Sequence, residues 1–251
     1  MGSLAESLVD SGHNVTMIVP ILEKELKTFG TGKGEVIVIP QCEAVAQYYE
    51  KFRDKSISNV WKEKENNWRF MKEILRRNVF WQAQCNYTLH HPGLFEQLKG
   101  RQFDAAISEP VDVCGFAIFE RLRINTTALT ISISVYEGSF AITGLPSYHS
   151  YVPGVMASYG DQMTFIERVQ NTLFHVFYHI GMSVTRSGFD ELFKEEYGEE
   201  FPSRMDLLSR ASLIFVNSEP LVNFPRPTIH KVIDIGGISF KHNPKPLNEV
   251  C

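Results

Sequence analysis

The chain has 251 residues, enough for one large domain, and its 43% apolar and 22% charged residues are ordinary for a globular protein. The formal net charge is −4 and no extended cluster of Lys and Arg occurs, so nucleic acid is not an expected partner. No apolar run approaches the roughly 20 residues that span a bilayer and no secretory signal opens the chain, so these residues predict neither anchoring nor export.

The cysteines and the glycosylation sequons carry little chemistry. Cys42, Cys85, Cys114 and Cys251 are too widely spaced for a zinc site or a redox pair, so we expect neither a metal site nor a resident cofactor. Cys114 lies in an apolar stretch, and we interpret it as a buried small hydrophobic residue. Three glycosylation sequons begin at Asn14, Asn86 and Asn125. Asn86 is the best placed to carry a glycan, because the other two adjoin predicted strands.

The first predicted elements are a helix and a strand. Residues 1–12 predict a helix with Leu4 and Leu8 on one face and Gly12 as a left-handed cap. Residues 13–19 are rich in β-branched side chains and predict a strand. Parallel sheets are built from strand–helix–strand units, so we expect a further strand to precede this helix.

A second strand and a long helical segment follow. Residues 30–34 predict a turn, because no Gly-Lys-Ser/Thr follows as in a phosphate loop, and residues 35–40 predict a strand. Residues 42–98 lack strand signals and predict a helical excursion over one end of the sheet. Its amphipathic spacing is carried by Trp61, Trp68, Met71, Leu75 and Val79. Interleaved basic residues are compatible with a cleft wall, a membrane-surface helix or a solvated face: Lys62, Lys64, Arg69, Lys72 and Arg76.

The second half of the chain alternates strands and helices. Thr164 and Glu167 form a capping box that opens a helix. The predicted buried stripe of that helix is Phe165, Val169, Leu173, Val176 and Ile180. The other predicted elements are strands at 103–108, 126–132, 212–216 and 232–235, helices at 111–121 and 188–197, and a loop at 144–154. This alternation predicts an α/β fold with a mostly parallel sheet covered on both faces.

Two sets of histidines invite a functional interpretation. His175 and His179 are four residues apart, as two metal ligands on one helix face would be. No glutamate follows His175 in the metalloprotease manner, so we expect an ordinary packed helix. His13 opens a predicted strand directly after a helix-ending glycine, and we expect it to be structural.

Four segments together resemble one known family. They are residues 4–16, 103–110, 211–238 and, more weakly, 148–153. In this order they are similar to the N-terminal, acceptor-binding domain of membrane-bound UDP-glucuronosyltransferases of the UDP-glycosyltransferase family. The resemblance implies a Rossmann-like domain over residues 1–240, the N-terminal half of a GT-B glycosyltransferase, with the interdomain linker starting at 241–251.

The resemblance also implies an activity. Such enzymes transfer glucuronate or glucose from a UDP-sugar co-substrate to a small lipophilic acceptor, with inversion at the anomeric carbon. A histidine after the first strand acts as general base, and an acidic residue orients it. The matching acidic residue here is Glu109, although the family often has Asp, and the histidine would lie upstream of Met1. From residues alone, Glu109 is equally compatible with a helix-terminal position stabilised by the helix dipole.

Further expectations follow from the same resemblance. Tyr148 and Tyr151 are expected to contact the acceptor, and the C-terminal half of the family holds the nucleotide. The intact proteins, which serve detoxification, lie in the endoplasmic reticulum membrane with this domain in the lumen. We expect the chain to be truncated at both ends and inactive alone. The alternatives are a truncated form that associates with full-length transferases, a small-molecule binding protein, or an incomplete gene prediction.

Overall fold

The computed structural model describes residues 1–24, 28–56, 67–111, 113–132, 142, 144–154, 157 and 159–240. Within them, the side chains of 51–56, 67–71, 73–75 and 184–186 are not described. Trp61 and the predicted linker at 241–251 therefore lie outside the described residues, as do the side chains of Trp68, Met71 and Leu75.

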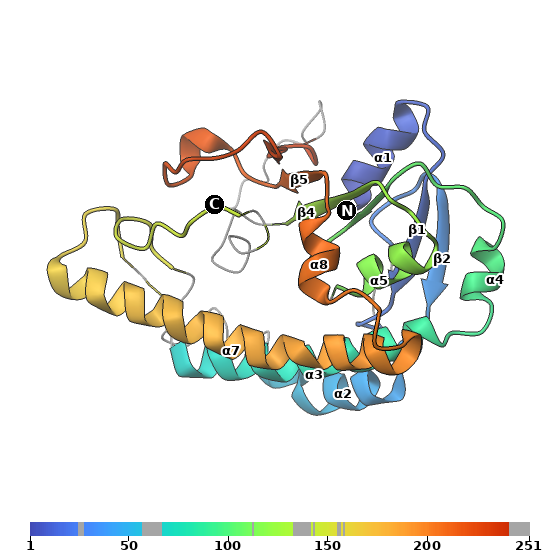
Figure 1. The fold of residues 1–251 in the computed structure, drawn as a ribbon, viewed down its shortest axis with the longest axis horizontal. Coiled ribbons are helices and arrows are strands. Elements are labelled where there is room, and N and C mark those ends of the chain that lie inside the picture. Colours follow the sequence, from blue (N-terminus) through green and yellow to red (C-terminus); the bar gives the residue numbers. More distant parts are fainter. Residues whose placement is uncertain are drawn as a thin grey trace, which may run out of the picture.

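Parallel strands with helices packed around them make up the fold (Figure 1). The strands are β1 (Thr16–Pro20), β2 (Glu35–Ile39), β3 (Ala106–Ser108), β4 (Thr127–Ile131), β5 (Leu213–Val216) and β6 (Val232–Asp234). The helices are α1 (Gly2–Asp10), α2 (Glu43–Ser56), α3 (Asn67–Leu89), α4 (Leu94–Leu98), α5 (Cys114–Arg121), α7 (Phe165–Tyr197) and α8 (Arg204–Ser209), with a 3₁₀ turn η1 (Pro220–Val222). The predicted α/β class and the helical excursion within 42–98 are confirmed.

The strands form two parallel groups, β1-β2 and β3-β4-β5-β6. Arg101, just before β3, bridges them by donating to both carboxylate oxygens of Glu35 on β2. Within the described part of the chain, β1 pairs only with β2 and β3 only with β4. Each of these two strands therefore has one edge to which no described strand bonds.

The turn before β1 is built as predicted. Gly12 has a φ of 91°, a left-handed conformation that glycine adopts without a steric penalty. The amide of His13 donates to the carbonyl of Leu8 at 3.1 Å, which closes the end of α1. These residues are used in the turn, so β1 begins at Thr16 and is shorter than the predicted strand.

One buried cluster joins the strands to the helices. Ile39 and Ile214 on the strands are fully buried, as are Phe189 and Phe193 on α7, and Phe116 on α5 is 2% exposed. Val79, which the sequence placed in an amphipathic stripe on α3, is exposed. The buried face of α3 is instead partly polar and includes Asn78, Gln84 and Thr88.

Helix α7 differs from its prediction in two ways. It is a single helix of 33 residues, so the separate helix predicted at 188–197 is wrong. The helix continues through Gly188. This glycine is needed for the close approach to α3, since a Cβ here would come 2.5 Å from Gln82 Oε1. The capping box at its start is confirmed, since Thr164 accepts from the Glu167 amide and the Glu167 carboxylate accepts from the Thr164 amide.

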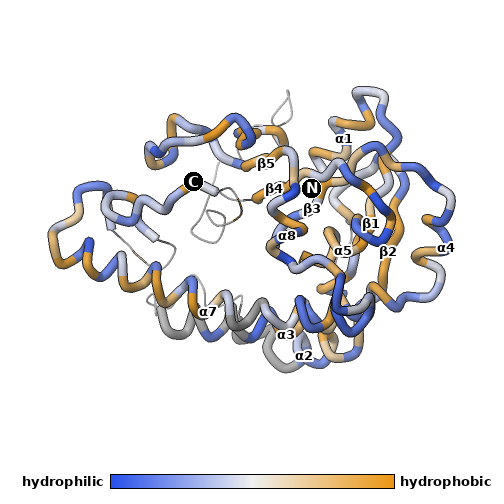
Figure 2. Tube along the Cα trace, in the orientation of Figure 1, coloured by the Kyte–Doolittle hydropathy of each residue, from blue (hydrophilic) through white to orange (hydrophobic). Residues whose placement is uncertain are grey.

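The predicted buried stripe of α7 is wrong. All five of its residues are exposed, along the part of the helix that reaches away from the strands (Figures 1 and 2): Phe165, Val169, Leu173, Val176 and Ile180. The buried positions are Asn171, Tyr178, Met182, Phe189 and Phe193, which recur at spacings of seven and four. This buried face begins with Asn171, a polar residue. A prediction based on hydrophobicity alone therefore chose the more apolar face of α7, which is the exposed one.

Asn171 fixes the loop before α7. Its side chain is completely buried, and its Nδ2 donates to the carbonyls of His149 at 2.6 Å and Val152 at 2.9 Å. Its Oδ1 accepts from the Gly154 amide at 2.9 Å. One side chain thus satisfies three backbone groups of the loop that carries Tyr148 and Tyr151.

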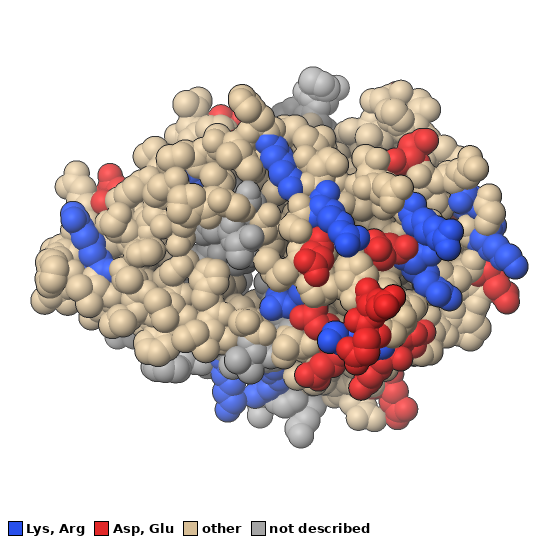
Figure 3. Space-filling view, in the orientation of Figure 1, with Lys and Arg blue, Asp and Glu red and all other residues tan. Residues whose placement is uncertain are grey.

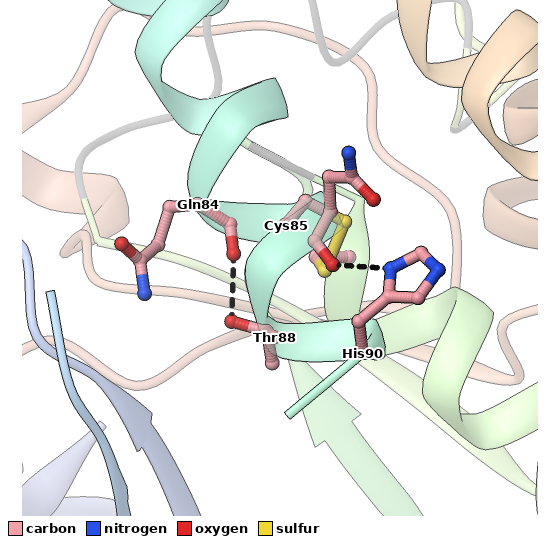
Figure 4. Close-up of a disulfide and its surroundings, with 6 residues drawn as sticks. Gln84, Cys85, Thr88 and His90 are labelled. Atoms are coloured by element: carbon pink, nitrogen blue, oxygen red, sulfur yellow. Dashed lines mark hydrogen bonds between the residues drawn. A yellow bond between two sulfur atoms is a disulfide. The ribbon is translucent and has the colours of Figure 1, made fainter. Parts of the chain in front are cut away.

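Cys114 is buried, as predicted, but it also forms a disulfide with Cys85, which the sequence did not indicate (Figure 4). The bond joins the C-terminal part of α3 to the first residue of α5 across 29 residues of sequence. Spacing alone does not disclose such a pair, because the two cysteines meet only when α3 crosses the start of α5. Cys42 is a free, buried cysteine.

Reduction of this disulfide is expected to lower the free energy of unfolding by about 3–4 kcal/mol, the chain-entropy value for a loop of this length. Urea unfolding with and without dithiothreitol measures it. The double variant Cys85→Ala/Cys114→Ala is the control, since its unfolding midpoint should not respond to reductant. Recovery of both thiols by alkylation of the unreduced protein would contradict the bond.

Replacement of Asn171 by Ala is expected to destabilise the fold by about 2–3 kcal/mol, because it leaves buried backbone groups without partners. The loop at 144–154 should also be cleaved faster by chymotrypsin at Tyr148 and Tyr151. Thr172→Ala is the matched control, because the Thr172 hydroxyl bonds only locally, to the carbonyl of Arg168. Equal cleavage rates in both variants would show that Asn171 does not hold the loop.

Candidate functional site

Polar side chains follow each strand of the β3–β6 sheet. Glu109 comes directly after β3 and Ser132 after β4. Asn217 and Ser218 follow β5, and Asp234 ends β6. Because the four strands are parallel, these residues share the carboxyl edge, where open α/β sheets bind ligands.

Hydrogen bonds connect these residues across the edge. Oε1 of Glu109 accepts from the Ser132 amide at 3.1 Å and from its hydroxyl at 2.5 Å. The Asn217 side chain donates to the Ser132 carbonyl at 3.0 Å, and the Ser218 hydroxyl donates to Asp234 at 2.5 Å. The Glu109 carboxylate is therefore fixed by the neighbouring strand end, with both Ser132 bonds on one of its oxygens.

The alternative interpretation of Glu109 was a helix-terminal residue. Helix α5 starts at Cys114, its N-cap is Val113, and no side chain caps it. Glu109 is half-buried five residues earlier and bonds to β4 instead of to α5. Its position thus suits a site at the sheet edge, and its catalytic role stays a prediction.

A small cavity lies beside the disulfide, beyond the end of β1. Its volume is about 80 Å³, well below the roughly 300 Å³ of the smallest drug-sized sites. Gln84 is held in its wall by accepting from the Cys42 amide and donating to the Pro40 carbonyl, both at 2.9 Å. The lining residues are Pro20, Leu22, Trp81, Gln84, Cys85, Thr88 and Cys114. The carboxyl end of β1, the C-terminal part of α3 and the start of α5 therefore enclose this cavity.

The two predicted acceptor-binding residues form a pair. The rings of Tyr148 and Tyr151 are half-buried, with centroids 5.8 Å apart. Burial lowers the pKa of the Arg226 guanidinium, and the charges of Tyr151 and Asp234 oppose that shift. Tyr151 and the β6 end therefore both lie within electrostatic reach of Arg226. None of the described contacts joins either tyrosine directly to Glu109.

A histidine cluster joins α7 to the preceding loop: His175 and His179 lie on the helix, and His149, which the sequence did not single out, lies in the loop. The His175 ring stacks on His149 at 5.1 Å and meets His179 edge-on at 4.5 Å, while its Nε2 lies 2.9 Å from the Ser147 hydroxyl. Burial and the neighbouring His149 lower the pKa of His175. Among the described residues no group of three His, Cys, Asp or Glu is arranged to hold a metal ion. His13 is exposed in the turn before β1.

The asparagines of all three sequons are exposed. Asn86 is exposed on α3, but Thr88 of the same sequon is buried and donates to the Gln84 carbonyl. Asn14 and Asn125 are equally exposed in the segments before β1 and β4, so the expected hindrance from neighbouring strands does not separate the three. Glycosylation of Asn86 stays a prediction. No helix in the described part of the chain is long and apolar enough to cross a membrane.

Comparison with known proteins assigns this architecture to a family. The family model described as UDP-glucoronosyl and UDP-glucosyl transferase matches residues 1–250. The chain is 30% identical to UDP-glucuronosyltransferase 3A2 of Homo sapiens, over 96% of this chain and 45% of that protein. It is 26% identical to the putative UDP-glucuronosyltransferase ugt-47 of Caenorhabditis briggsae, over 94% of this chain and 44% of the relative.

The chain thus spans less than half the length of these relatives. Its parallel strands and helices agree with the Rossmann-like N-terminal half of a GT-B fold. Because the family model matches nearly every residue, the chain belongs to the family of UDP-glucuronosyl and UDP-glucosyl transferases, and it corresponds to their N-terminal part.

Proposed function

We propose that this chain is the acceptor-binding part of an enzyme that transfers glucuronate or glucose from a UDP-sugar to a small lipophilic acceptor. The observation that carries the proposal is the Glu109 carboxylate, fixed by Ser132 at the carboxyl edge of the sheet. A histidine supplied from outside these residues would donate a hydrogen bond from one ring N–H to this carboxylate. Its other nitrogen would then take the acceptor's proton.

The chemical step is a single displacement. The acceptor oxygen forms a bond to the anomeric carbon as the bond from that carbon to the UDP oxygen breaks, which inverts the carbon. The acceptor proton goes to the histidine, and the negative charge leaves with UDP. Glu109 does not touch the sugar in this scheme; it orients the base, as a carboxylate beside an imidazole does.

The sheet provides a place for the strand that carries such a histidine. β1 and β3 each have an edge that no described strand pairs, and Arg101 and Glu35 hold the two groups together. A strand that pairs with both edges would end near Pro20 and Ser108, beside the small cavity and Glu109. The proposal therefore includes a central strand from a segment not among these residues.

The location is proposed on the same basis. We propose that the intact protein lies in the endoplasmic reticulum membrane with this domain in the lumen. The lumen is an oxidising compartment, in which a disulfide such as Cys85–Cys114 persists. An alternative proposal is that this chain associates with a full-length transferase, which would contribute a nucleotide-binding half from another molecule.

Glu109→Gln is expected to reduce glucuronosyl transfer by about 10²-fold or more, because the general base loses the carboxylate that orients it and stabilises its charged form. The assay uses this chain joined to the remaining segments of the human 3A2 relative, with UDP-glucuronate and a phenol. Stability should be unchanged, because the amide oxygen still accepts from Ser132. Glu120→Gln is the control, since Glu120 pairs with Arg210 on the surface. Equal activities of the two variants would remove Glu109 from the mechanism.

Tyr151→Ala is expected to weaken binding of a planar phenol such as 4-methylumbelliferone to this chain by about tenfold, because an aromatic contact is lost. Fluorescence titration measures the dissociation constant, and UDP-glucuronate should not change it. Tyr159→Ala is the control, because Tyr159 lies outside the 144–154 loop and its hydroxyl bonds to Gln170. An identical dissociation constant for wild type and Tyr151→Ala would place the acceptor elsewhere.

A further inference from the structure

Three imidazole rings lie where the loop at 144–154 meets α7. The His175 ring on the helix stacks on His149 of the loop, with centroids 5.1 Å apart, and its Nε2 lies 2.9 Å from the hydroxyl of Ser147. His179, one turn further along α7, meets the His175 ring edge-on at 4.5 Å. All three rings are half-buried. The loop is thus attached to α7 by side chains that can take up a proton at mildly acidic pH.

The cluster fixes the turn that carries the two tyrosines of the loop. Both chain neighbours of Tyr148 contact the His175 ring. The Tyr148 carbonyl accepts hydrogen bonds from the amides of Tyr151 at 3.2 Å and Val152 at 2.9 Å. These two amides are therefore protected from exchange with solvent while the turn is closed.

Asn171 anchors the far end of the same loop through an uncharged group. Its Oδ1 accepts from the Gly154 amide at 2.9 Å, and its Nδ2 donates to the Val152 carbonyl at 2.9 Å. A carboxamide does not titrate, whereas histidine changes its charge between about pH 5 and pH 8. The loop therefore has one attachment that responds to pH and one that does not.

A charge on this cluster is unfavourable while the loop is closed. Burial and the charge of His149 lower the pKa of His175. The Nδ1 of His149 is buried without a described hydrogen-bond partner, so a proton placed there would gain no acceptor. Two protonated rings stacked at 5.1 Å would also repel each other. Protons therefore bind more readily once the loop has separated from α7.

Formal charges are remote from the cluster on the two elements that form it. The loop contains no charged residue, and α7 has none between Arg168 and Arg186. The acidic part of α7 starts at Asp190, about 22 Å along the helix from His175, and Figure 3 shows acidic side chains gathered over this C-terminal half. A protonated ring therefore gains no carboxylate from the adjacent turns of α7 or from the loop. The titratable side chains beside the rings or the loop are three phenols and one guanidinium: Tyr148, Tyr151, Tyr178 and Arg226.

Helix α3 is the third element at this position. It runs in the same direction as α7, because Gly188 lies against Gln82 and Glu196 pairs with His90 at 2.8 Å. The same offset places residues 69–73 of α3 level with the cluster. The charged residues of this stretch are the exposed Lys72 and two whose side chains are not described, Arg69 and Glu73. The charge described on this side is therefore positive, and like charges disfavour protonation of the rings.

We propose that His149 and His175 form a pH-sensitive latch that holds the loop at 144–154 against α7. When both rings are uncharged, they stack, and the Ser147 hydroxyl lies within hydrogen-bond distance of His175. When a ring is protonated, the closed arrangement contains a half-buried charge, and the first half of the loop separates from the helix. Asn171 keeps the far end attached, so the loop opens as a flap.

The pH range follows from the direction of the pKa shift. The closed loop lowers the pKa of His175 below the ordinary value of about 6.5, so the open loop binds the proton more tightly. The latch is therefore closed above about pH 6.5 and opens increasingly as the pH falls below that value. Because Tyr148 and Tyr151 are proposed acceptor contacts, acceptor binding should weaken in the same range, and this consequence alone rests on the proposed function.

Amide hydrogen exchange of the chain tests the latch, measured by NMR at pH 7.5 and pH 5.5 and corrected for the intrinsic exchange rate. The protection factors of the Tyr151 and Val152 amides are expected to fall about tenfold at the lower pH. This factor corresponds to one proton bound on opening, one pH unit below the pKa of free histidine. The Gly154 amide, which bonds to Asn171, should keep its protection and is the internal control.

Variants without a titrating ring separate the latch from other effects of acid. His175→Gln retains a group that can bond to Ser147, and the fall in protection should disappear. His149→Phe makes the same test from the loop, because it keeps an aromatic ring in the stack and cannot be charged. His13→Gln is the matched control, since His13 is exposed in the turn before β1 and the tenfold fall should persist.

Three results would overturn the proposal. They are wild-type protection of Tyr151 and Val152 that does not change with pH, an unchanged pH effect in both latch variants, and an equal loss of protection at Gly154. The last result would show that acid unfolds this region as a whole. None of these measurements involves an acceptor or a sugar donor, so failure here leaves the proposed function standing.

Discussion

The parallel pairing of β3, β4, β5 and β6 is the constraint on which the candidate site depends. Parallel strands deliver all their carboxyl ends to one edge, so Glu109, Ser132, Asn217 and Asp234 become neighbours although 125 residues separate the first from the last. The hydrogen bonds from Ser132 then give Glu109 one defined orientation. A residue that must orient a base needs this rigidity, because a mobile carboxylate would lose much of its effect.

Helix α7 connects the core to the loop that carries Tyr148 and Tyr151. Its C-terminal half packs into the core through Phe189 and Phe193, and its N-terminal half holds the tyrosine-bearing loop through Asn171. The apolar residues of the predicted stripe lie outward on the same N-terminal half.

Individual elements differ in how far the sequence predicted them. The Gly12 cap, the Thr164–Glu167 capping box and the strands depend on neighbouring residues, and each was recoverable from local pattern. The phase of α7 was not, because its buried face includes Asn171, whose partners are backbone groups of a loop about twenty residues earlier. The Cys85–Cys114 bond was missed for the same kind of reason.

What the sequence determined by itself was the fold class, the parallel sheet and the position of Glu109 directly after a strand, because hydrophobic periodicity and turn chemistry act over a few residues. Family membership also followed from it, through the order of short motifs. Only the tertiary structure decided which face of α7 is buried, which cysteines pair and which group fixes the Glu109 carboxylate. Those outcomes depend on contacts between segments distant in sequence, and a local pattern contains no information about its partner's position.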